Sequence, residues 1–148
     1  MQSLKVLPIN AFALVEVLVT SALLTMLAGF GIVIGTDGYK NYLFHSEEQT
    51  LLATLNTARS HALNNIYEMP HGVHIEPSAY IIFRGSIYTA GAATNESISR
   101  NTAIATSGIS EVVFTQLAGD ANIPGSITLN DGIRSRTITI NNEGTIHW

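Results

Sequence analysis

The sequence predicts an α+β fold in which one long N-terminal helix packs on an antiparallel β-sheet. Three observations lead to this prediction. No charged side chain occurs from Val17 to Gly35, and apolar side chains then recur at helical spacing as far as about Asn65. After Pro70 the apolar period changes from 3.6 to 2, which is typical of strands. The 148 residues are enough for one domain of ordinary size.

The composition is unusually apolar for an acidic soluble domain. Hydrophobic residues make up 46% of the chain and charged residues 12%, with a net charge of −4; a charged fraction of about 25% is usual. The 7 Lys and Arg residues are scattered, so nucleic acid is disfavoured as a partner. The absence of cysteine excludes disulfide scaffolds and thiolate metal sites.

The uncharged segment predicts a single membrane-spanning helix. At ~1.5 Å per residue, Val17 to Gly35 spans roughly 28 Å, close to the ~30 Å hydrocarbon core of a bilayer. A secretory signal peptide is the alternative, but its apolar stretch is usually shorter. Glu16 needs an explanation, because a carboxylate at mid-bilayer costs about 2.5–3.5 kcal/mol unless it has a partner or lies at headgroup depth.

The helix is expected to continue beyond Gly38 into the first helix of a head, with Leu51, Leu55, Ala58 and Ala62 facing the strands. Ala90 to Gly108 has no clear period and predicts a loop or irregular edge segment. Turns are expected at Pro77–Ser78, Arg84–Gly85, Asn130–Gly132 and Asn141–Gly144. The alternating runs predict strands at Gly72–Glu76, Tyr80–Arg84, Glu111–Leu117, Ser126–Leu129, Thr137–Asn141 and Thr145–Trp148.

The ten residues from Ala11 to Thr20, AFALVEVLVT, resemble the prepilin-type cleavage and methylation motif of type IV pilins and type II secretion pseudopilins. The resemblance implies that a membrane aspartyl peptidase cuts between Ala11 and Phe12, that the new amine of Phe12 is methylated, and that Glu16 guides assembly. Ala11 departs from the glycine that is usual before the cut. Alanine is the next smallest side chain, so cleavage remains sterically feasible and is expected to be slower.

Segments of the second half are similar to minor pseudopilins and minor pilins of the GspH/FimT family. They are Ala58–Ala62, His71–Ile75, Tyr80–Gly85 and Ile138–Gly144. The resemblance implies a pilin-like fold, with a leader at residues 1–11, a transmembrane and filament-core helix at 12–35, and a head at 36–148. It also implies a subunit that assembles through its N-terminal helix into a filament, at or near the tip.

The resemblance implies that the protein first lies in the bacterial inner membrane and crosses it once. Its N-terminus would then be cytoplasmic and its head periplasmic or extracellular. After assembly it would be part of the filament. The implied partners are other pilin or pseudopilin subunits, the prepilin peptidase and the inner-membrane assembly platform. A plain single-pass protein with an uncleaved anchor is an alternative. The sequence leaves open whether the subunit serves secretion, a pilus or DNA uptake.

We expect no enzyme, cofactor or metal site. The chain has no GxSxG, HExxH, GxxxxGK[ST] or GxGxxG motif. His71 and His74 are three apart on an expected strand, so they face opposite sides and do not form a metal site. DNA capture by a minor pilin is a further alternative, for which Arg134 and Arg136 are candidate phosphate contacts; a solvated strand edge is the simpler interpretation.

Overall fold

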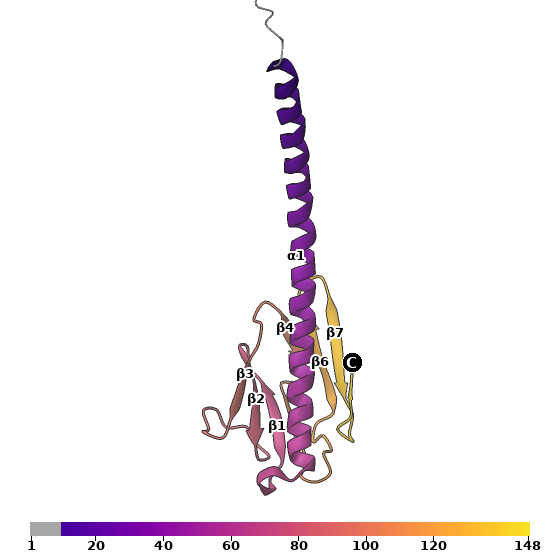
Figure 1. The fold of residues 1–148 in the computed structure, drawn as a ribbon. Helices are drawn as coiled ribbons and strands as arrows, with labels where there is room; N and C mark the ends of the chain where they lie inside the picture. Colours follow the sequence, from indigo (N-terminus) through magenta and orange to yellow (C-terminus); the bar gives the residue numbers. More distant parts are fainter. Residues whose placement is uncertain (1–9) are drawn as a thin grey trace, which may run out of the picture. The chain divides into compact units, whose positions relative to one another are not determined.

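The computed structural model describes residues 10–148, except for the side chains of residues 10–12 and 30–36. The fold is α+β (Figure 1), with a helix packed against antiparallel sheets as expected. The chain divides into two compact units, Met1–Asn41 and Tyr42–Trp148, and the boundary falls within the long helix α1 (Asn10–Leu63). Each unit is described by itself.

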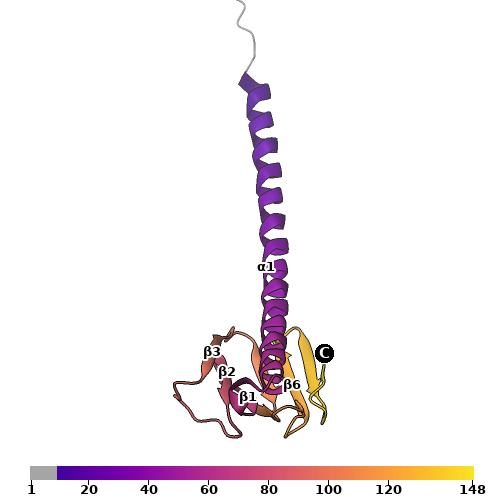
Figure 2. The ribbon, with the colours of Figure 1, turned by 60° about the horizontal axis from the view of Figure 1, so that its bottom comes forward.

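The second unit contains two four-stranded antiparallel sheets, where the sequence predicted one. Their strand orders are β3-β2-β1-β5 and β4-β6-β7-β8. In both views β1–β3 and β6 lie on either side of the last part of α1 (Figures 1 and 2). The strands are β1 (His71–Ile75), β2 (Ala79–Arg84), β3 (Glu96–Ser99), β4 (Ala105–Gly108), β5 (Glu111–Phe114), β6 (Gly125–Asn130), β7 (Ser135–Ile140) and β8 (Ile146–His147).

One face of α1 supplies the centre of the core. Leu51, Leu55, Ala58 and Ala62 are each fully buried, as their helical spacing predicted. They pack in one cluster with apolar side chains from both sheets, so the expected contact between this helix face and the strands is confirmed. The sheet residues of that cluster include Val73, Tyr80, Ile82, Ile127, Leu129, Ile138 and Ile140.

Three of the four expected turns join neighbouring strands. Pro77–Ser78 connects β1 to β2, Asn130–Gly132 connects β6 to β7, and Asn141–Gly144 connects β7 to β8. The fourth prediction is wrong, because β2 does not fold back at Arg84–Gly85. The chain instead runs through a longer loop before it returns as β3.

The segment Ala90–Gly108 contains two short strands, β3 and β4, where we predicted a loop or irregular edge segment. Both are edge strands, each four residues long and mostly exposed. The alternation of apolar and polar residues that reveals a half-buried strand is therefore missing from them. Between β3 and β4 the chain crosses from the first sheet to the second, and between β4 and β5 it crosses back.

Gly108 is required where β4 ends, and this gives a test of the fold. Its φ is +104°, and a Cβ there would overlap the carbonyl oxygen of Ser126 on the paired strand β6. We expect Gly108→Ala to lower the free energy of unfolding by about 2–4 kcal/mol, since it combines backbone strain with a backbone clash. Chemical denaturation of the full-length protein in detergent measures the change.

Gly85→Ala is the matched control, because Gly85 has a φ of +101° but open space where the Cβ would lie. The control introduces backbone strain without a clash, so we expect it to lower the free energy of unfolding by about 1 kcal/mol. Equal losses for the two variants would contradict the close approach of β4 and β6 at Gly108.

Candidate functional site

The first unit exposes apolar side chains around the whole circumference of α1. Leu14, Val15, Val17, Leu18 and Val19 are each 52–66% exposed, and successive residues on a helix point about 100° apart. They leave one side of the helix open, and the exposed side chains of Leu23, Leu24 and Leu27 fill it one to two turns further on. A helix that is apolar all round is normally buried in lipid or among other helices. Among the described residues, no helix is long and apolar enough to cross a membrane. Phe12 and residues 30–35 of the expected segment have side chains outside that description, so the transmembrane assignment stays a prediction.

Glu16 is the acidic residue in this apolar surface. Nearby hydroxyl groups are satisfied within the helix, since Thr20 donates a hydrogen bond to the Glu16 carbonyl oxygen at 2.8 Å and Thr25 donates to the Ser21 carbonyl oxygen at 3.0 Å. Among the described residues, none pairs with the Glu16 carboxylate. The side chains of Ala11 and Phe12, the expected processing residues, lie outside the described part of the chain.

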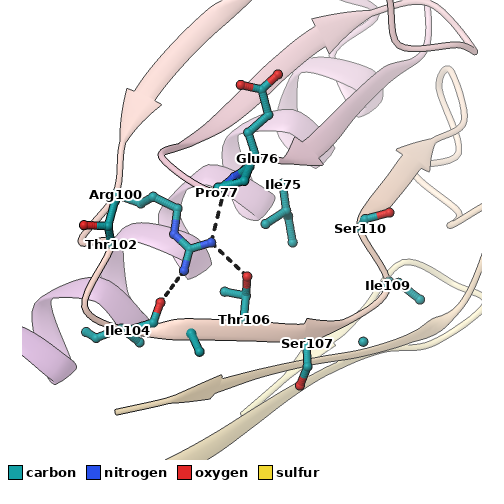
Figure 3. Close-up of a pocket in the computed structure, with 12 residues that line it drawn as sticks. Ile75, Glu76, Pro77, Arg100, Thr102, Ile104, Thr106, Ser107, Ile109 and Ser110 are labelled. Carbon is teal, nitrogen blue, oxygen red and sulfur yellow. Dashed lines mark hydrogen bonds between the residues drawn. The ribbon is translucent and has the colours of Figure 1, made fainter.

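A cavity of about 410 Å³ lies where the chain crosses between the sheets (Figure 3). It is bordered by Ile75–Pro77 on one side and by β4 and the residues after it on the other. Figure 3 shows the Arg100 side chain reaching across it. The guanidinium donates to the Glu76 carbonyl oxygen at 3.3 Å, to Thr106 Oγ1 at 2.8 Å and to the Ile104 carbonyl oxygen. Arg100 therefore links the end of β1 to β4.

A buried carboxylate holds Arg100 in this position. Glu47 on α1 is 4% exposed, and its Oε1 lies 3.6 Å from Arg100 Nε. The Tyr80 hydroxyl donates to the same carboxylate at 2.6 Å, and the Asn101 amide donates to its other oxygen at 2.9 Å. Burial first, and then the bond to Glu47, raises the pKa of Tyr80 well above its usual range, so the phenol stays protonated. The cluster neutralises buried charge and joins helix to sheet.

Arg134 and Arg136, the candidate phosphate contacts, are both close to carboxylates. Arg134 lies in the β6–β7 turn, with Nη1 3.2 Å from Asp131 Oδ2. Arg136 is on β7, with Nε 3.9 Å from Glu48 Oε1 on α1. These neighbours reduce the positive potential that a phosphate would meet, and no described contact brings the two arginines together as one site.

His71 and His74 face opposite sides of β1, as their spacing predicted. His71 is 1% exposed, and its Nδ1 donates to the Met69 carbonyl oxygen at 3.1 Å. Burial lowers the pKa of His71, although the bond to Met69 partly opposes this. His74 instead stacks on Tyr88 at 4.0 Å, with Nδ1 3.0 Å from Glu111 Oε2. Within the described part of the chain, no three His, Asp or Glu residues are grouped to hold a metal ion.

Comparison with known proteins yields no further assignment. No family model, no curated protein and no solved structure matches this chain. The α+β arrangement of an N-terminal helix on antiparallel sheets is consistent with a pilin-like fold.

The Glu47 cluster predicts a stability effect. Glu47→Gln keeps the shape of the side chain but removes the charge facing Arg100, and leaving one partner of a buried ion pair unmatched is costly. We expect the free energy of unfolding to fall by about 3 kcal/mol. Chemical denaturation of the full-length protein is the measurement.

Glu143→Gln provides the matched charge removal, because Glu143 is exposed in the β7–β8 turn. Its effect is expected to stay within about 0.5 kcal/mol. If Glu47→Gln were no more destabilising than this control, the buried cluster would not hold the helix to the sheet.

Proposed function

We propose that this chain is a minor pilin or pseudopilin, a non-enzymatic subunit that assembles through its N-terminal helix into a filament of a type II secretion or type IV pilus system. The main support for this proposal is the apolar surface around α1, in which Glu16 has no partner among the described residues. Such a surface needs a covering of lipid before assembly and of neighbouring helices afterwards. The prepilin-like residues Ala11 to Thr20 lie on this same segment.

Processing creates the partner that Glu16 lacks. Cleavage between Ala11 and Phe12 leaves a positively charged amine on Phe12, four positions before the carboxylate. In an apolar environment an unpaired carboxylate is costly, so pairing with the amine of its own or a neighbouring subunit is strongly favoured. Packing of Leu14, Val17 and Leu18 supplies most of the free energy of assembly, and the charge pair sets the register between helices.

The second unit forms most of the head in this proposal. Residues 12–35 hold the subunit in the inner membrane before assembly, and residues 36–148 lie on the periplasmic side. The prepilin peptidase and the assembly platform act on the N-terminal segment, while the sheets face other subunits or the surroundings. A position at or near the filament tip follows from the resemblance to minor subunits.

Processing is tested by the intact mass and N-terminal sequence of the membrane-extracted protein, with and without a co-expressed prepilin peptidase. We expect a product that begins at N-methylated Phe12 only when the peptidase is present. Replacement of Ala11 by Gly is expected to speed the cut, because it restores the residue usual in the family. If both the original protein and the Ala11→Gly variant kept Met1 in the presence of the peptidase, the result would favour a plain uncleaved anchor.

Assembly is tested by Glu16→Ala. This variant is expected to insert and to be cleaved, but to be lost from filaments sheared off the cells and isolated by pull-down, since the charge pair is missing. Asp37→Ala is the control, because Asp37 is an exposed carboxylate further along the same helix. Incorporation of Glu16→Ala at the level of the control would overturn the proposed role of Glu16.

A further inference from the structure

A second cavity, of about 210 Å³, lies near the C-terminal end of α1 and has no part in the proposed assembly. His61 on α1 and Tyr67 in the short 3-10 helix η1 (Ile66–Glu68) line it, together with one polar residue from each of three adjacent strands. These are His71 on β1, Arg84 on β2 and Glu96 on β3. His71 is directly opposite Arg84, and Ile82 directly opposite Glu96, so the three polar side chains share the helix-facing side of the sheet.

Tyr67 forms one wall of the cavity, and the backbone at this residue and its neighbours is strained. Tyr67 and Glu68 both have left-handed conformations, with φ of 57° and 56°, and Asn65 precedes them with φ of 52°. Such conformations cost of order 1–3 kcal/mol each for residues other than glycine. No residue of η1 is buried, so burial of this turn does not offset the strain. The turn instead places the Tyr67 ring 3.4 Å from the Arg84 guanidinium carbon.

His71 provides an acceptor that no described protein group uses. Its Nδ1 must carry the proton, because it donates to the Met69 carbonyl oxygen. Nε2 therefore has a free lone pair, and this atom has no hydrogen-bond partner within the described part of the chain; it is buried too completely for a bound molecule to contact it. An unpaired buried acceptor costs about 1–3 kcal/mol and is rare in folded proteins.

Arg84 and Glu96 provide opposite charges at two positions on the cavity wall. They are diagonal neighbours on β2 and β3, an arrangement that separates Cβ atoms by ~7–8 Å. Neither Arg84 nor Glu96 takes part in a salt bridge within the described part of the chain. A molecule that carries both charges can bridge this gap.

We propose that this cavity binds a small zwitterion, a free α-amino acid, with its carboxylate on Arg84 and its ammonium group on Glu96. The guanidinium offers two parallel N–H donors to a carboxylate, and the Tyr67 ring fixes its plane. An ammonium group donates charge-assisted hydrogen bonds to a carboxylate such as that of Glu96. The volume lies below the ~300–1,000 Å³ usual for drug-sized ligands, so the amino acid has a short side chain.

Isothermal titration of the full-length protein in detergent with glycine and L-alanine tests the proposal. Both are expected to bind, whereas acetate and methylammonium, which carry one charge each, are not. Arg84→Gln and Glu96→Gln are each expected to weaken binding at least tenfold. Arg134→Gln and Glu143→Gln are the controls and leave binding unchanged, because they remove the same charges away from the cavity.

Glu96 is exposed on an edge strand, so Glu96→Gln tests the site even if Arg84→Gln does not fold. Absence of binding by both amino acids at millimolar concentration would overturn the proposal, as would unchanged binding by folded Glu96→Gln. Binding of Zn²⁺ instead, lost in His61→Ala, would assign the cavity to a metal ion and would also overturn it.

Discussion

The fold of the second unit depends on two adjacent buried carboxylates on α1. Glu47 accepts hydrogen bonds from Tyr80 on β2 and from the backbone of Asn101. Glu48, also buried, lies beside Arg136 on β7. Two neighbouring helix residues thus contact the two different sheets, and the apolar face of the same helix fills the space between them. Because each sheet has its own hydrogen-bond ladder, the position of one sheet relative to the other depends on contacts between them. This helix and Arg100 supply side-chain contacts, and Ile109 and Ser110 add backbone hydrogen bonds to Ser126 and Ile75.

The sequence allowed prediction of those elements whose signal is local. The helix ends at Leu63, close to the expected Asn65, because apolar residues on its buried face recur with a period of 3.6. Strands β1, β2, β6 and β7 were recognisable by alternation and by the turns between them. The prediction for Glu111–Leu117 was too long, since β5 ends at Phe114 and Leu117 adopts a positive φ.

The remaining features depend on contacts between residues far apart in the chain. Glu47 occupies a polar position in the helical pattern and would be solvated in an isolated helix. Its burial depends on Tyr80 and Arg100, which β2 and the β3–β4 connection bring to it. The cavity beside Tyr67 likewise depends on strand register and on the left-handed turn at that residue. The candidate processing residues Ala11 and Phe12 and the candidate assembly residue Glu16 could be proposed from sequence because their motif is contiguous. Among the described residues, none pairs with the Glu16 carboxylate.

The bridge made by Arg100 also has a consequence for solubility. β4 ends its sheet, so one side of its backbone has no neighbouring strand, and such edges readily pair with other chains and promote aggregation. Arg100 stands beside that side and binds the Ile104 carbonyl oxygen and the Thr106 hydroxyl. The Arg100 side chain is itself buried, so it acts here by occupying the Ile104 carbonyl oxygen next to β4, a group that a docking strand would otherwise use. The residue that spans the gap between the sheets thereby leaves fewer free hydrogen-bonding groups at this edge of the second unit.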